Sequence, residues 1–264
     1  MNQDYQENQE TPENINNQDN GVIEIPDTQT LKVLYTSDIK GNTDNISYLA
    51  TIIKQKIADT NFSILVDSGN WAKGTMLADH FKGMPMVEIL NYLSYDAVGI
   101  GEGEIAFGSQ NLYNIAGEAK FPLLCANLVE SGTGIPPYFL DKKFVIKEKG
   151  PFIVGITAIA NPQVYPGTGI EAKDPFAILP DVFNEMQKHN PDVIILLSRL
   201  GTERDKAIAR AFPQISLIVG AGEEPLESPI REGNTFIVRP GDNGRFLGAI
   251  DFDMEAVIKI SQAQ

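Results

Sequence analysis

The chain has 264 residues, of which 42% are hydrophobic, so it can bury the core of one large domain or two small ones. Its net charge of −14 would repel a phosphate backbone, and we do not expect nucleic-acid binding. The single cysteine, Cys125, excludes an internal disulfide framework. The apolar runs are too short for a transmembrane segment, and no signal peptide is visible.

The first segment, residues 1–30, holds seven acidic residues, no basic residue and eleven Asn or Gln residues. Such a segment cannot bury enough apolar surface to offset the entropy lost on ordering, so we expect a disordered acidic tail. An alternative is a tether between the domain and an anchor, although the sequence contains no lipobox. We expect residues 31–264 to form the folded domain.

Strands and helices alternate early in this domain, and strands follow one another closely near its end. Short apolar runs predict strands at Leu31–Thr36, Ser63–Asp67, Tyr95–Ile100, Phe121–Ala126, Phe144–Lys149, Phe152–Thr157, Asp192–Leu197, Ser216–Val219, Thr235–Arg239 and Leu247–Phe252. Apolar residues at helical spacing predict helices at Ile46–Ala58, Pro85–Leu93, Gln110–Ala119, Ile178–His189 and Arg204–Phe212. Gly150-Pro151 predicts the turn of a hairpin. This order is typical of an α/β protein with mixed sheets.

Motifs of the common catalytic classes do not account for the chain. Val98–Gly103 begins like a dinucleotide-binding GxGxxG motif, but Glu104 stands where the third glycine would fall. Cys125 lies in an apolar strand with no histidine nearby in sequence, which favours a buried structural thiol over a nucleophile. The two histidines, His80 and His189, lie on or beside predicted helices and belong to no metal-ligand motif.

Seven segments nevertheless fall in a recognisable order along the chain. They are Leu34–Asn42, Leu65–Thr75, Tyr95–Gly108, Phe121–Asn127, Ile194–Leu200, Leu217–Pro225 and Gly241–Asp251. Their order and spacing resemble the metallophosphatase domain of the 5'-nucleotidase and UDP-sugar hydrolase family, a branch of the calcineurin-like phosphoesterases. The resemblance covers roughly residues 32–254. It implies a four-layer α/β/β/α sandwich of two mixed sheets, and we expect the family's C-terminal nucleotide-binding domain to be absent.

The resemblance also gives the positions of the family's metal ligands and catalytic groups in this chain. At most of these positions the chain has a different residue type from the family. The DxH motif falls at Asp38–Lys40, which keeps the aspartate but replaces the histidine by lysine. The metal-bridging aspartate falls at Asn70, and the ligand asparagine and catalytic histidine fall at Glu102 and Gly103. A ligand histidine falls at Arg199.

The remaining positions change as well. The aspartate that orients the catalytic histidine falls at Ala106, and the GHxH pair falls at Gly222 and Glu224. A two-metal phosphoesterase centre needs a bridging carboxylate and neutral imidazoles. Asn70 has lost that charge, and the cations of Lys40 and Arg199 would repel a divalent ion. We therefore expect no metal cofactor and no catalytic residue.

On the family's template six side chains converge on one place, which we call the vestigial pocket: Asp38, Lys40, Asn70, Glu102, Arg199 and Glu224. We expect a salt-bridge cluster there, with each cation beside at least one of the three carboxylates. Two alternatives stay open. One is neutral drift in a solvated groove, and the other is a single Ca²⁺ or Mg²⁺ held by oxygen donors, which the neighbouring cations disfavour.

These observations predict a pseudoenzyme, a degenerate phosphoesterase domain that acts as a non-catalytic binding, scaffold or assembly module. Another protein is the expected partner. The resemblance implies export to the periplasm, cell envelope or extracellular space, and a cytoplasmic location stays open. One alternative is a metal-dependent phosphoester or nucleotide hydrolase with an atypical site. A second is a small-anion sensor in which Lys40 and Arg199 bind phosphate or a carboxylate.

Overall fold

The computed structural model describes residues 29–222 and 224–253. The expected disordered tail, residues 1–30, therefore lies almost wholly outside the described residues, and Thr30 already begins strand β1. Among the helices of these two stretches, none is long and apolar enough to cross a membrane.

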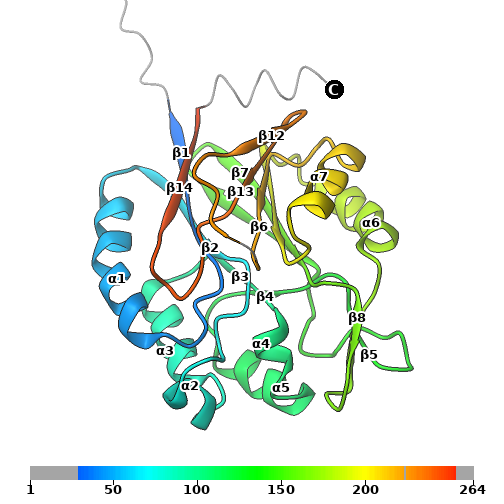
Figure 1. Cartoon of the computed structure of the whole chain (residues 1–264). Helices are drawn as coiled ribbons and strands as arrows, with labels where there is room; N and C mark the ends of the chain where they lie inside the picture. The colour runs from blue at the N-terminus through cyan, green and yellow to red at the C-terminus, as the bar shows by residue number, and fades with distance from the viewer. Residues whose placement is uncertain (1–28, 223, 254–264) are drawn as a thin grey trace, which may run out of the picture.

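The first sheet has five strands in the order β14-β1-β2-β3-β4 (Figure 1). Its strands are β1 (Thr30–Thr36), β2 (Phe62–Asp67), β3 (Ala97–Gly99), β4 (Leu123–Leu124) and β14 (Gly248–Asp253). The first four run parallel, and β14 pairs antiparallel with β1. The sheet is therefore mixed, as expected, although β3 and β4 are shorter than the predicted strands Tyr95–Ile100 and Phe121–Ala126.

The second sheet has six strands in the order β12-β13-β11-β10-β7-β6. Its strands are β6 (Phe144–Lys149), β7 (Phe152–Ile159), β10 (Val193–Ser198), β11 (Leu217–Val219), β12 (Ile230–Glu232) and β13 (Thr235–Val238). The outer strands β6 and β12 are antiparallel to their neighbours, and the inner four are parallel. The predicted hairpin is confirmed, because β6 and β7 pair on either side of Gly150.

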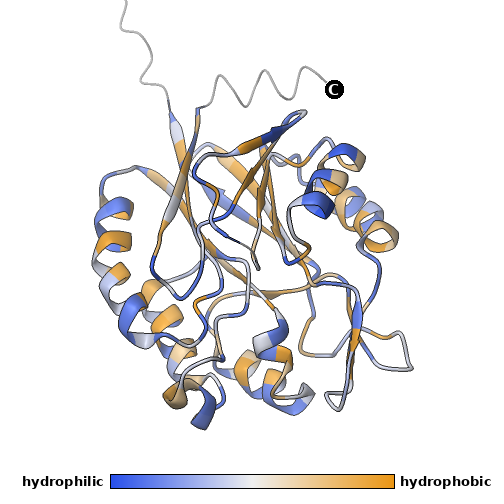
Figure 2. Ribbon diagram, viewed as in Figure 1, coloured by the Kyte–Doolittle hydropathy of each residue, from blue (hydrophilic) through white to orange (hydrophobic). Residues whose placement is uncertain are grey.

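Helices cover the outer face of each sheet. The helices α1 (Thr43–Ala58), α3 (Met84–Leu93) and α5 (Ser109–Glu118) pack on the first sheet, and α6 (Pro175–Gln187) and α7 (Thr202–Ala211) pack on the second. Their apolar sides face the sheets and their polar sides face outward (Figure 2). The helix predicted at Ile178–His189 begins earlier, because the Asp174 side chain caps the helix at Phe176.

The two sheets enclose the main core. Along β1, Leu31 and Val33 belong to the core between the sheets, whereas Leu34 faces the helices of the first sheet. Phe152 of β7 is also fully buried there. Alternate residues of one strand thus serve two cores, which requires apolar residues on both faces and explains the continuous apolar runs in the sequence. The four-layer α/β/β/α sandwich is confirmed.

Several short elements were not predicted. They are the helices α2 (Met76–His80) and α4 (Glu102–Ile105), strand β12, and a third sheet of strands β5 (Leu128–Glu130), β9 (Ile170–Ala172) and β8 (Gln163–Tyr165). These elements have three to five residues, which is too short for a hydrophobic period to show. The helix α4 matters most, because it carries part of the candidate site.

Candidate functional site

The vestigial pocket lies where parallel strands of both sheets end. Asp38 and Lys40 follow β1, Asn70 follows β2, and Glu102 begins α4 shortly after β3. Arg199 comes directly after β10 of the second sheet. Because the carboxyl ends of parallel strands meet at one edge, the fold brings these five residues together.

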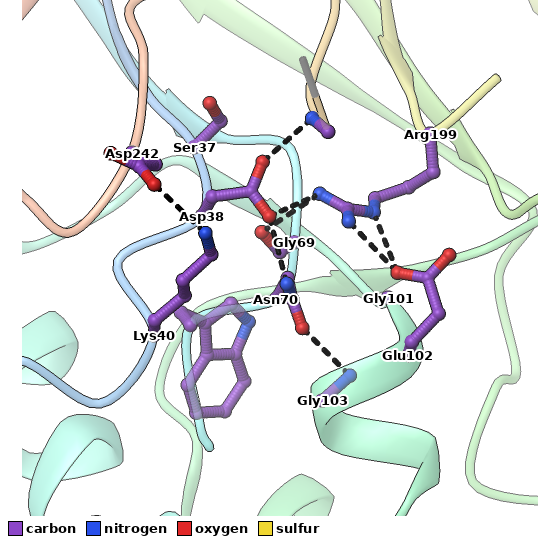
Figure 3. A network of polar contacts seen from close by, with 12 residues as sticks. Ser37, Asp38, Lys40, Gly69, Asn70, Gly101, Glu102, Gly103, Arg199 and Asp242 are labelled. Carbon is purple, nitrogen blue, oxygen red and sulfur yellow. Dashed lines mark hydrogen bonds and ion pairs between the residues drawn. The ribbon is translucent and has the colours of Figure 1, made fainter. Parts of the chain in front are cut away.

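Arg199 lies at the centre of the cluster (Figure 3). Its Nη1 donates to Oδ1 of Asp38 at 3.0 Å, and its Nη2 and Nε donate to Oε2 of Glu102 at 2.8 and 3.1 Å. The side chains of Arg199 and Asp38 are only 6% and 4% exposed, whereas that of Glu102 is 39% exposed. Burial would lower the pKa of Arg199, but the carboxylates of Asp38 and Glu102 raise it, and the net shift is upward. Arg199 therefore stays charged.

Both carboxylate oxygens of Asp38 accept hydrogen bonds from the protein. Oδ1 accepts from Nδ2 of Asn70 at 2.8 Å as well as from Arg199, and Oδ2 accepts from the backbone N–H of Gly222 at 2.8 Å. The Asn70 amide also accepts from the backbone N–H of Gly103 at 2.8 Å. Asn70 thus needs both a donor and an acceptor, which an ionised aspartate at this position could not supply.

The two loops that carry Asp38 and Asn70 have an unusual backbone. Asp38, Lys40 and Asn70 have φ angles of 48°, 53° and 65°, in the left-handed region. Each such residue costs of order 1 kcal/mol or more unless its surroundings hold it. Backbone hydrogen bonds do so here, from Asp38 to the carbonyl of Gly69 at 3.1 Å and from Lys40 to that of Asn70 at 3.0 Å.

Glu104 is a residue of the site that sequence reasoning missed. Its fully buried carboxylate accepts from the backbone N–H groups of Asn70, Ala72 and Gly101 at 2.8, 2.7 and 2.8 Å. Burial nevertheless raises the pKa of Glu104 above its usual value. The sequence contained a signal, because a glutamate three residues after an N-cap position is typical of a capping box. Glu104 holds the Asn70 loop against α4.

Asp67, at the end of β2, lies fully buried beneath the same loops. It accepts from Oγ1 of Thr36 and from the backbone N–H of Gly69, both at 2.7 Å. The hydroxyl of Tyr95 lies 2.9 Å from Oγ1 of Thr36. Burial raises the pKa of Asp67 to about 7, although the bonds from Thr36 and Gly69 lower it. From the sequence alone, Asp67 is predicted only as the last residue of a strand.

We expected Lys40 to form an ion pair with one of the three carboxylates of the vestigial pocket, and this prediction is wrong. Nζ of Lys40 pairs with Oδ2 of Asp242 at 2.9 Å (Figure 3). Arg245 donates to the other oxygen of Asp242 at 2.6 Å. The bonds from Lys40 and Arg245 lower the pKa of Asp242 to about 2. This pair is more open than the Arg199 cluster, because the side chains of Lys40 and Asp242 are 38% and 32% exposed.

Glu224 lies at the rim and not in the cluster. It is exposed, and it takes part in no ion pair within residues 29–222 and 224–253. Its backbone carbonyl accepts from Nη1 of Arg239 at 3.0 Å. Together with Asp38, Lys40 and Asp242 it lines a half-open cavity of about 460 Å³. The cation cluster expected to include Glu224 therefore consists of Arg199 with Asp38 and Glu102.

The donor set does not fit a two-metal centre. Both oxygens of Asp38 are bonded to protein donors, and one of these is a guanidinium. In the part of the chain that the structure describes, no three His, Cys, Asp or Glu side chains could hold a metal ion. The histidines lie elsewhere, His80 against Phe81 and His189 against Phe144.

Comparisons with known proteins agree with this fold. No family model matches the chain. The structure resembles that of the calcineurin-like phosphoesterase YfkN from Bacillus subtilis with a TM-score of 0.73 and 21% identity, over 86% of this chain and 85% of that chain. The fold is thus that of the calcineurin-like phosphoesterases.

Similarity to curated proteins narrows the class of protein from this fold to one family. The chain is 28% identical to the snake venom 5'-nucleotidase of Crotalus adamanteus over 209 residues, or 74% of this chain and 36% of the relative. It is 31% identical to the human 5'-nucleotidase over 195 residues, or 69% of this chain and 34% of the relative. The chain belongs to the metallophosphatase domains of the 5'-nucleotidase family, and it spans about a third of the length of these relatives.

Proposed function

We propose that this domain is a pseudoenzyme of the 5'-nucleotidase family, in which an arginine–carboxylate network replaces the metal centre. The observation that carries the proposal is the Arg199 guanidinium, which bonds to Asp38 and Glu102. A buried guanidinium can neutralise carboxylates as a metal ion would, but it cannot activate water or polarise a phosphoryl group. The domain would then serve as a non-catalytic binding, scaffold or assembly module, with another protein as its partner.

The residues around the network support the absence of catalysis. Gly103, where the resemblance places the catalytic histidine, has no side chain, and its N–H is bonded to Asn70. A general acid must reach the leaving group with a proton, and a glycine cannot supply one. The alternative, a hydrolase with an atypical metal site, would require Asp38 to exchange its bonds with Arg199 and Gly222 for a metal.

The second alternative, a small-anion sensor, has less support from the geometry. Arg199 already bonds to two carboxylates, and Lys40 already pairs with Asp242. An incoming phosphate or carboxylate would have to displace these partners. Location is a separate proposal: we infer export, because one relative is a snake venom protein.

The test is a hydrolysis assay of the full chain with Mn²⁺, Mg²⁺, Zn²⁺ or Co²⁺ present. The substrates are p-nitrophenyl phosphate, bis-p-nitrophenyl phosphate, AMP and 2',3'-cyclic AMP, with an active calcineurin-like phosphoesterase assayed in parallel. We expect no turnover above the metal-only background, and the same background for Asp38→Ala. Metal-dependent turnover that disappears in Asp38→Ala would overturn the proposal.

A further inference from the structure

Strand β6 presents a free edge of the six-stranded sheet. It is the last strand in the sheet order and pairs with β7 alone among the described strands. Within the described residues, no backbone hydrogen bond outside that ladder reaches residues 144–149. In an antiparallel pair, alternate N–H and C=O groups of the outer strand point away from its partner. These groups of β6 can pair with an added strand.

A groove runs beside this edge. One cavity of about 520 Å³ is lined by residues 141–146 and by His189, whose ring packs on Phe144. A second cavity of about 170 Å³ is lined mainly by apolar side chains, among them Phe121, Leu123 and Phe139. Both cavities include Asp141 and Lys142, so they adjoin. We call the two together the β6 groove.

The charge of the groove differs from that of the whole chain. Residues 141–149 hold four lysines and two acids, a net charge of +2 in a chain of net charge −14. Lys149 pairs with Asp96 at 2.9 Å. Lys142, Lys143 and Lys147 take part in no ion pair among the described residues, and the first two are exposed. Of these, Lys142 and Lys143 line the groove, and their two charges are available to an incoming carboxylate.

An exposed aromatic cluster borders the apolar end of the groove. The rings of Tyr113 and Tyr138 lie 5.1 Å apart, and Tyr138 contacts Phe139 at 5.9 Å between centroids. Tyr138 and Ile135 are 70% and 62% exposed. Because Phe139 also lines the smaller cavity, apolar surface continues from the cluster into the groove.

We propose that the β6 groove binds an extended, acidic peptide segment of a partner protein, which adds to the sheet beside β6. The free edge selects an extended backbone, the lysines select acidic side chains, and the cavity beside Phe139 takes an apolar one. The groove shares no residue with the vestigial pocket, so the proposal does not depend on whether that pocket is catalytic. The contrary explanation is that the lysines only protect a free edge from aggregation.

The test is fluorescence anisotropy of the full chain with a labelled ten-residue peptide of alternating Glu and Val that ends in Phe. Two matched probes separate the contribution of the acidic side chains from that of the peptide backbone. One has Lys in place of Glu, and the other keeps all side chains but carries N-methyl groups on alternate backbone nitrogens. We expect binding of the acidic peptide alone, because charge and a free backbone are both required.

The protein variants complete the experiment. Lys142→Glu with Lys143→Glu should weaken binding at least tenfold, whereas the same charge change on α1, Lys54→Glu with Lys56→Glu, should leave it unchanged. Equal binding of the N-methylated peptide, or no binding of the acidic one, would overturn the proposal. If the acidic peptide binds only after the acids of residues 1–28 are replaced by Asn and Gln, the occupant is the chain's own segment and the partner is excluded. The hydrolysis assay is independent of every one of these outcomes.

Discussion

Arg199 and Asp38 form a nearly buried ion pair at 3.0 Å that connects the two sheets of the sandwich. Asp38 follows β1 of the first sheet, and Arg199 follows β10 of the second. In the metallophosphatase relatives the resemblance places metal ligands at both positions. Here the ion pairs of Arg199 with Asp38 and with Glu102 join the two sheets at the pocket, and their energetics decide whether the cluster is structural.

Replacing Arg199 by methionine should destabilise the protein clearly. The change leaves the buried Asp38 carboxylate without its cation, which costs roughly 3–5 kcal/mol of the free energy of unfolding. Urea denaturation monitored by circular dichroism measures the loss. The matched control is Lys40→Met, because the Lys40–Asp242 pair is about one-third exposed and should contribute at most about 1 kcal/mol. Equal losses in the two variants would show that the Arg199 cluster is only a solvated remnant.

The two carboxylates should couple to Arg199 unequally. Asp38 is 4% exposed and Glu102 is 39% exposed, so water screens the Glu102 pair more strongly. In double-mutant cycles with Arg199→Met, Asp38→Asn should therefore show the larger coupling energy, and both doubles should cost less than the sum of the singles. Additive losses in both cycles would contradict an interacting cluster.

Long elements could be predicted from sequence and short ones could not. The helix Thr43–Ala58 and the strands Phe62–Asp67 and Val193–Ser198 carry hydrophobic patterns that persist over several residues, so their positions were predicted to within a few residues. The helix Glu102–Ile105 has one turn, and packing rather than propensity holds it. The strand Leu123–Leu124 is shorter than the predicted strand Phe121–Ala126. It pairs with its neighbour over only two residues.

The candidate site likewise contains contacts that could be predicted from the sequence and contacts that could not. The resemblance to the family predicted that Asp38, Asn70 and Arg199 meet. The structure brings them together because each follows a parallel strand. The pairing of Lys40 with Asp242, 202 residues later, was missed because Asp242 belongs to no metal-ligand motif. Glu104 was missed because its partners are backbone N–H groups, and its only signal in the sequence is a capping-box spacing that begins at a glycine.

Asn70→Asp should destabilise the domain and should not be rescued by metal. The change restores the family's residue type, but it removes the donor to Asp38 and places two carboxylates side by side. A lost hydrogen bond at a buried acceptor costs about 1–3 kcal/mol. Thermal unfolding of the variant with Mn²⁺ or with EDTA measures both the loss of stability and any rescue by metal. A midpoint that rises with Mn²⁺ in Asn70→Asp but not in wild type would show that the pocket still accepts a metal.

The pH dependence of stability should report on Asp67. Its pKa is about 7 in the folded protein, above its ordinary value of 3.8, so the folded state binds a proton more tightly than the unfolded state. The favourable contribution is complete below pH 4, falls as the pH rises, and is fully lost above pH 7.

Asp67→Asn isolates this effect because the amide stays neutral and can still bond to Thr36. Between pH 5 and pH 8, wild type should lose about 2–3 kcal/mol more of its free energy of unfolding than the variant does. The control is Asp181→Asn on the exposed side of α6, which should follow wild type at both pH values. Urea titrations at the two pH values measure the difference. Parallel losses in wild type and Asp67→Asn would mean that Asp67 is ionised in the folded protein at pH 5, and that its burial is compensated by the bonds from Thr36 and Gly69.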